Sequence, residues 1–179
     1  MRKYFPNTPA RRVHWFFRHV MKCERDVADT LTRLATYNEH LPTGSPLSPI
    51  LAYYSYLDVW QAVAKFAAGK GFVLTVYIDD VAVSGDKVTA EDMWSIKRII
   101  HAAGLRYHKE KHYVQSAPEI TGVIVQDGIL RVPNRQLKKL WEAKQKLTLA
   151  SNSEERIYLT NLVRGLTGQI EQVRKVCLP

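Results

Sequence analysis

The feature that most constrains this chain is an apolar run, Phe72 to Ile78, that ends in two adjacent aspartates, Asp79 and Asp80. A short run rich in β-branched and aromatic residues predicts a buried strand. A second apolar run starts at Val81, and the turn sequence Ser84-Gly85-Asp86 closes it. The sequence therefore predicts a β-hairpin that holds both carboxylates at its tip.

The two carboxylates are a candidate metal site. Adjacent carboxylates at the end of an apolar strand repel each other, and a divalent cation would relieve that repulsion. Mg²⁺ prefers carboxylate and phosphate oxygens. Neighbouring side chains of a strand point to opposite faces, so a turn has to re-aim one aspartate before both can reach one ion. An isolated Asp-Asp pair is more commonly a solvated strand end, so the pair alone does not establish a metal site.

Length and composition indicate a folded, non-membrane chain. With 179 residues, of which 46% are hydrophobic, one or two small domains with a proper core are expected. No apolar run approaches the ~18 residues of a membrane span, and residues 1–6 lack the apolar stretch of a signal peptide. Cys23 and Cys177 lack metal-site spacing, so we expect a reducing, cytoplasmic location and no membrane partner.

The charge is unevenly distributed along the chain. Residues 1–42 carry 8 Lys or Arg and 4 Asp or Glu, residues 43–130 carry 8 and 9, and residues 131–179 carry 10 and 4. The two basic ends and the near-neutral centre fit a polyanion that lies across the ends, with metal chemistry between them. A merely soluble basic protein explains the net charge of +9 equally well.

Hydrophobic spacing predicts several helices, with a break in the first near residues 23–24: about 9–37, 49–69, 89–103, 134–149 and 154–176. Three helix starts have a local signal: Thr8-Pro9, Ser48-Pro49 and the capping box from Thr89 to Asp92. A Pro-rich loop, 41–49, leads into the second helix. Alternating apolar runs, 120–125 and 129–132, flank Asp127-Gly128 and predict a second hairpin. The expected fold class is α+β.

In order and spacing, these pieces resemble the second half of a reverse transcriptase, most closely the bacterial retron and retron-like group. The resemblance spans essentially the whole chain. Its elements are a YxDD box (Tyr77-Ile78-Asp79-Asp80), an LPQGxPxSPxL-like element (Leu41 to Leu51), a lysine-bearing motif (Gly104-Leu105 with His108 and Lys111), a VTG-like signature (Ile120-Thr121-Gly122) and a thumb-helix pattern (Arg164 to Ile170).

The resemblance implies a fold and an activity. It implies a polymerase palm over 1–132, with an antiparallel sheet and packed helices, followed by a helical thumb over 133–179. The implied activity is RNA-directed DNA polymerisation with two Mg²⁺ ions, or Mn²⁺ instead, and its partners are an RNA template, a DNA or RNA primer and dNTPs. The retron-like group also suggests a role in antiphage defence.

The resemblance assigns roles to residues of this sequence. Asp79 and Asp80 would hold metal, and Lys111 would protonate the leaving pyrophosphate, although a solvated lysine explains it too. Phe5 would block a ribonucleotide 2′-hydroxyl, with a core aromatic as the equal alternative. Residues implied to line the nucleotide and template are Thr43, Gly44, Ser45, Pro46, Ser48 and Tyr77. Residues implied to hold the primer and duplex are Thr121, Gly122, Lys138 and Lys139.

The sequence departs from the family pattern at three places. Thr43 stands where the family usually has Gln, and Tyr53 where Asn is common. Residues 1–7 resemble what directly follows the first catalytic aspartate. We therefore expect that carboxylate and the fingers to lie upstream of Met1 or on a separate chain. The alternative is a catalytically inactive nucleic-acid-binding or assembly module derived from a polymerase.

Overall fold

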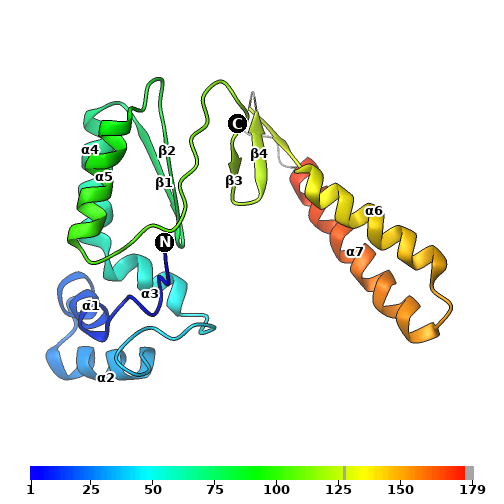
Figure 1. The fold of residues 1–179 in the computed structure, drawn as a ribbon. Helices are drawn as coiled ribbons and strands as arrows, with labels where there is room; N and C mark the ends of the chain where they lie inside the picture. Colours follow the sequence, from blue (N-terminus) through cyan, green and yellow to red (C-terminus); the bar gives the residue numbers. More distant parts are fainter. Residues whose placement is uncertain (127, 176–179) are drawn as a thin grey trace. The chain divides into compact units, whose positions relative to one another are not determined.

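The computed structural model describes residues 1–126 and 128–175. The chain forms two compact units, Met1–Glu110 and Lys111–Pro179, which are described separately (Figure 1). Each unit combines helices with a small antiparallel sheet, which fits the predicted α+β class. The functional division at residues 132 and 133 stays a prediction.

The first unit contains one hairpin and six helical segments. They are α1 (Ala10–Trp15), the π-helix η1 (Phe16–Val20), α2 (Arg25–Ala35), α3 (Ser48–Ser55), α4 (Leu57–Gly69), β1 (Val73–Tyr77), β2 (Asp80–Ser84) and α5 (Ala90–Ala102). The predicted break in the first helix is confirmed, because residues 21–24 separate η1 from α2.

Helices cover one face of the hairpin. Leu74 and Val76 of β1 are partly buried and pack against the core, with Trp60 of α4 and Ile96 of α5 among its buried members. The alternate side chains of β1 face away, and Val73 and Tyr77 are both exposed. A strand with one covered face shows this period of two. Figure 1 shows α4 and α5 beside β1 and β2, with α1, α2 and α3 near the tip of the hairpin.

Two helix predictions in this unit were wrong in detail. The predicted helix over 49–69 is two helices, because Tyr56 leaves the helical region with φ −119° and ψ 26°. The hydroxyl of Thr8 does not cap α1. It donates to the carbonyl of Tyr4 at 2.9 Å, and Pro9 occupies the N-cap position instead.

Two buried phenols tie the N-terminal segment to α3. The Tyr4 hydroxyl donates to the carbonyl of Ala52 at 3.0 Å, and the Tyr56 hydroxyl donates to the carbonyl of Asn7 at 2.9 Å. Burial raises the pKa of both tyrosines, so both remain protonated donors at neutral pH. These bonds fix the segment from Met1 to Thr8, which leads back to the hairpin tip.

The second unit is a three-stranded sheet followed by a helical hairpin. Its elements are β3 (Glu119–Ile120), β4 (Val123–Gln126), β5 (Ile129–Arg131), α6 (Asn134–Leu149) and α7 (Ser153–Lys175), with strand order β3-β4-β5. Ala143 of α6 and Leu159 and Ile170 of α7 are buried, and the two helices pack along one another.

The β3–β4 connection corrects one prediction. The run 120–125 was expected to be one strand, but Thr121 and Gly122 form a two-residue turn inside it, with φ +47° and +86°. Positive φ at both positions is typical of a type I′ turn. The predicted turn between β4 and β5 includes Gly128, at φ +72°, and Asp127, which lies outside the described residues. Cys177 also lies outside them.

No helix in the described ranges combines the length and apolar character needed to cross a bilayer.

The capping box at the start of α5 is confirmed and gives a stability prediction. The Asp92 amide donates to Thr89 Oγ at 3.2 Å, and the Thr89 amide donates back to the Asp92 carboxylate at 3.1 Å. We expect Thr89→Ala to lower the free energy of unfolding by about 1 kcal/mol, measured by urea unfolding. Thr30→Ala, at an exposed interior position of α2, is the control and should change it by less than about 0.5 kcal/mol. Equal losses in both variants would contradict a capping role.

The same carboxylate makes stability depend on pH. Hydrogen bonds from Thr89, together with Lys70 at 3.1 Å, lower the pKa of Asp92 below its ordinary value. A lowered folded-state pKa adds stability above the unfolded-state pKa, and that stability is lost as the pH falls through the folded-state pKa. Asp92→Asn should therefore be less stable than the wild type at pH 7, and the difference should shrink by pH 3. A difference that stays constant between these pH values would contradict this origin.

Candidate functional site

The hairpin tip is a tight turn with unusual backbone geometry. Tyr77 pairs with Asp80, so Ile78 and Asp79 are the two residues of the loop. Ile78 has φ +54°. A β-branched residue rarely adopts this left-handed region, and the conformation costs roughly 1–2 kcal/mol. Backbone strain of this kind is found preferentially at functional sites.

The turn places the two carboxylates at different positions. Asp79 lies in the loop, and Asp80 is the first residue of β2. Both are exposed, and the Asp79 side chain is 52% accessible. The sequence predicted that a turn must redirect one of the two aspartates, and Asp79 lies in such a turn.

The N-terminus lies beside the acidic pair. The Met1 ammonium donates a hydrogen bond to the carbonyl of Asp79, and its nitrogen is 3.8 Å from Asp79 Oδ2. In Figure 1 the chain starts at the tip of the hairpin. Tyr4 also lies close enough for the Asp79 charge to act on its phenol. Residues 78 positions apart in sequence therefore meet at this site.

The donor set fits part of a Mg²⁺ site. Asp79 and Asp80 offer the hard oxygen ligands that Mg²⁺ takes. Within residues 1–126 and 128–175, no group of three or more His, Cys, Asp or Glu could hold a metal ion. Mg²⁺ commonly binds through one or two carboxylates together with waters and substrate phosphates, so the pair can contribute to a site without forming a closed cage.

The predicted nucleotide loop precedes α3. Thr43, Gly44 and Pro46 are exposed, and Gly44 has φ +95°, which favours glycine. Ser48 is buried, and its hydroxyl donates to the carbonyl of Pro42 at 2.6 Å. Ser45 Oγ accepts a hydrogen bond from the amide of Leu47 at 3.3 Å. The hydroxyl groups of both serines therefore stabilise the conformation of this loop.

Two aromatic candidates lie in the same unit. Phe5 is half-buried, packs against the core and lies next to Tyr4, with the ring centroids 6.0 Å apart. Both interpretations of Phe5, core aromatic and nucleotide contact, stay open. Tyr77 is 60% exposed on the face of β1 that no helix covers.

The remaining candidates belong to the second unit. Lys111 is exposed, and its charge helps to lower the pKa of Glu119. Lys138 and Lys139 are exposed on α6, with Lys138 Nζ 3.8 Å from Glu142 Oε1. Gln136 Nε2 donates to the carbonyl of Gly122 at 2.9 Å, which attaches the Thr121–Gly122 turn to α6.

Sequence reasoning missed several contacts around these candidates. Arg135 Nη1 donates to Glu119 Oε2 at 2.6 Å, and this ion pair is the main cause of the lowered pKa of Glu119. Neither the Arg135–Glu119 pair nor the Gln136–Gly122 bond has a local sequence signal. The left-handed backbone of Ile78 could have been expected from a two-residue turn in a tight hairpin.

No model of a known protein family matches the chain. Over 144 residues, 76% of its length, it is 26% identical to the retron Ec86 reverse transcriptase of Escherichia coli. Over 137 residues, 70% of its length, it is 21% identical to the retron Se72 reverse transcriptase of Salmonella heidelberg. About three quarters of the chain is therefore similar to retron reverse transcriptases, and we call this matched part the retron-like region. The matched parts cover 44% and 36% of these two relatives, so the retron-like region spans less than half of either.

The strained turn gives a prediction for the retron-like region. Ile78→Gly removes the free-energy cost of the left-handed backbone at position 78. This gain in stability offsets the lost side-chain packing and the greater entropy of the unfolded chain. We therefore expect the unfolding free energy to stay within about 0.5 kcal/mol of the wild type. Ala82→Gly, in β2 of the same hairpin, should cost about 1 kcal/mol. Urea unfolding measures both, and a loss in Ile78→Gly larger than that in Ala82→Gly would rule out strain at the tip.

Proposed function

We propose that this region is the palm and thumb part of an RNA-directed DNA polymerase, and that Asp79 and Asp80 are its metal-binding carboxylates. The observation that carries the proposal is the hairpin tip. Two exposed carboxylates are held on a strained two-residue turn, in a chain similar to retron reverse transcriptases.

Each part of the tip has a task in this proposal. Asp79, on the loop, is the principal metal ligand, and Asp80 supports it from the first position of β2. A bound Mg²⁺ would lower the pKa of the primer 3′-hydroxyl and neutralise charge on the transferred phosphoryl group. The short loop keeps the Asp79 carboxylate in one place, which limits the reorganisation needed during reaction.

The third carboxylate would come from a residue directly before Met1. The Met1 nitrogen is 3.8 Å from Asp79 Oδ2, so a residue attached there would lie beside the acidic pair. Its carboxylate could reach the same ion as Asp79. A separate chain that supplies the carboxylate is the alternative source of this third ligand.

The other candidates would act on the substrates. Phe5, Tyr77 and the exposed part of the loop from Thr43 to Ser48 would contact the nucleotide and template. Lys111 would protonate pyrophosphate. The Thr121–Gly122 turn would hold the primer, and Lys138 and Lys139 would contact the duplex backbone. Antiphage defence stays a prediction from the resemblance to the retron-like group.

The test compares two N-terminal extensions of the chain, one that places Asp directly before Met1 and one that places Asn there. We expect the Asp form to bind Mn²⁺ about tenfold more tightly, because affinity rises with ligand charge, as measured by electron paramagnetic resonance. We also expect Mg²⁺-dependent dNTP incorporation on a primed RNA template once a segment that forms the fingers is added upstream of this Asp. Asp79→Asn should abolish both.

Other outcomes separate the alternatives. Equal Mn²⁺ affinity in the Asp and Asn forms would contradict the proposed third ligand. Template binding without incorporation, in the chain extended by a fingers segment and the Asp, would favour an inactive polymerase-derived module. Incorporation that survives Asp79→Asn would exclude the hairpin tip as the metal site.

A further inference from the structure

The beginning of the chain has an unusual charge distribution. Residues 1–23 contain six Lys or Arg and no Asp or Glu: Arg2, Lys3, Arg11, Arg12, Arg18 and Lys22. Two of these cations have acidic partners. Arg12 Nη1 lies 3.1 and 2.9 Å from the carboxylate oxygens of Asp58, and Arg18 Nη1 lies 4.0 Å from Glu24 Oε2.

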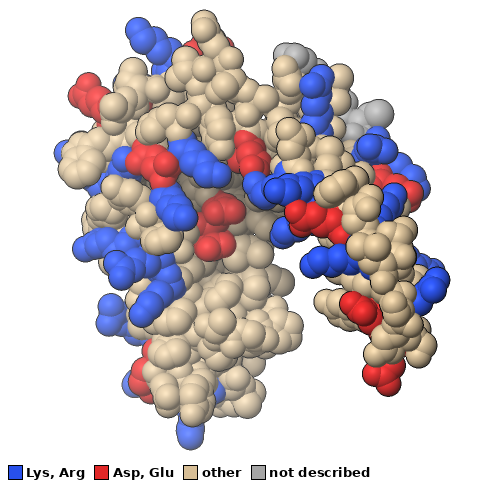
Figure 2. Space-filling model, turned by 45° about the vertical axis from the view of Figure 1, so that its right-hand side comes forward, with Lys and Arg blue, Asp and Glu red and all other residues tan. Residues whose placement is uncertain are grey.

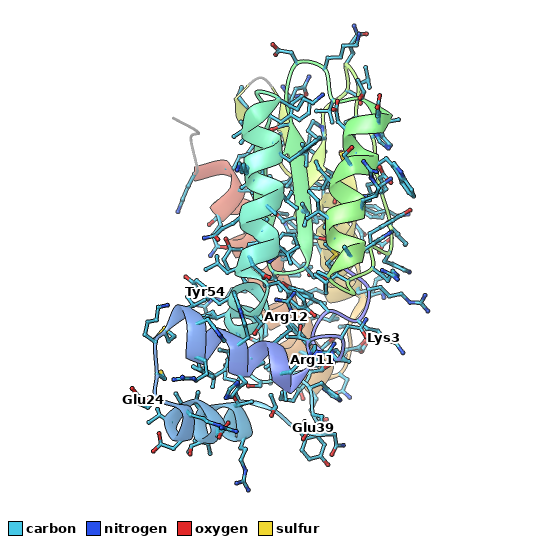
Figure 3. The ribbon with its side chains drawn as sticks, turned by 90° about the vertical axis from the view of Figure 1, so that its left-hand side faces the viewer. Lys3, Arg11, Arg12, Glu24, Glu39 and Tyr54 are labelled. Carbon is cyan, nitrogen blue, oxygen red and sulfur yellow. The ribbon has the colours of Figure 1, made fainter. Side chains whose placement is uncertain are left out.

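Three of the remaining cations meet around Asn7. The Asn7 side chain donates to the carbonyl of Arg2 at 3.0 Å, and its amide donates to the carbonyl of Lys3 at 2.9 Å. The Asn7 carbonyl accepts the Tyr56 hydroxyl, and Arg11 is close enough for its charge to act on that phenol. Figure 3 shows Lys3, Arg11 and Arg12 together where the N-terminal segment meets α1.

A fourth cation extends this group towards α5. The Arg2 amide donates to the carbonyl of Arg106 at 2.8 Å, which places the two residues side by side. We use the name basic strip for Arg106, Arg2, Lys3 and Arg11. The Arg106 guanidinium also donates to the carbonyls of His101 and Leu105 at 3.1 and 3.0 Å. Figure 2 shows many Lys and Arg side chains on one flank of the first unit, with Asp and Glu side chains between some of them. Through Met1, the strip begins next to Asp79.

In the described part of the chain, acidic partners do not account for the charges of the strip. Within the described part of the chain, the side chains of Arg2, Lys3 and Arg11 have no acidic partner within 4.0 Å, and all three residues are exposed. Lys3 also has φ +46°, which is unfavourable for a residue with a long side chain. Clustered like charges repel each other and lower stability. A ligand with regularly spaced negative charges would remove that repulsion.

We propose that the basic strip binds the phosphate backbone of a single RNA strand that runs past the acidic pair and across the start of α1. The choice of RNA rests on the proposed function, whereas the exposed cations Arg2, Lys3 and Arg11 indicate a polyanion independently of it. The strip is continuous with the candidate metal site through Met1 but does not include Asp79 or Asp80. Binding at the strip therefore needs neither metal nor nucleotide.

The test is fluorescence anisotropy with a labelled single-stranded RNA of about 20 nucleotides, in EDTA, over a series of salt concentrations. The strip variant is Lys3→Gln with Arg11→Gln. We expect its affinity to fall about tenfold, and the slope of log K against log[salt] to become shallower by about 1.4, since each phosphate contact to a single strand contributes about 0.7.

The matched control is Arg25→Gln with Arg33→Gln on α2, which removes the same two positive charges from exposed positions. It should lose less than about twofold in affinity and keep its salt slope, because its residues lie outside the strip. Thermal melting of both variants checks that they remain folded. Equal losses in the two variants would overturn the strip as a site, since net charge alone would then explain binding.

Two further results separate this inference from the proposed polymerase function. Asp79→Asn should bind the RNA as the wild type does in EDTA, even though we expect it to abolish metal binding and incorporation. If the wild-type chain fails to bind RNA in EDTA, the strip proposal is wrong, whatever the polymerase assay gives. If incorporation fails while the strip variant still shows its specific loss of RNA binding, only the proposed polymerase function is wrong.

Discussion

The apolar contact between the hairpin and its helices is the constraint on which the candidate site depends. A two-stranded hairpin is at best marginally stable by itself in water. Here Leu74 and Val76 pack against the core that α4 and α5 help to form. This one-sided burial fixes the register of β1 and β2, because a shift of one residue would turn the apolar side chains outwards. The register in turn makes Ile78 and Asp79 the loop.

The N-terminal segment depends on a different set of contacts. The rings of Tyr4 and Tyr56 are buried. The Tyr4 hydroxyl donates to the carbonyl of Ala52 in α3, and the Tyr56 hydroxyl donates to the carbonyl of Asn7 in the N-terminal segment. Because both phenols are desolvated, each unmade bond would cost about 1–3 kcal/mol. These bonds hold Met1 at Asp79, and they also hold Arg2 and Lys3 at the start of the basic strip. One pair of buried hydroxyls therefore supports both proposed sites.

Local strain and local charge concentrate in the same part of the first unit. Ile78 and Lys3 have left-handed backbones, and neither is glycine. Contacts on both sides hold each conformation: β1 and β2 pair on either side of the turn at Ile78, and the bonds of Arg2 to Arg106 and of Tyr4 to Ala52 flank Lys3. A polymerase site that binds metal, nucleotide and nucleic acid would gain from such fixed positions, since less reorganisation remains to be done on binding.

The sequence by itself determined the local features. The hairpin with its aspartates, the capping box at Thr89 and Asp92 and the order of reverse-transcriptase-like motifs all depend on residues close together in the chain, where hydrophobic period and side-chain chemistry act directly. Tertiary structure alone decided the break at Tyr56, the turn at Thr121 and Gly122 attached to Gln136, and the meeting of Met1 with Asp79. Those features depend on contacts between residues far apart in sequence, and long-range hydrogen bonds and core packing outweigh local propensity there.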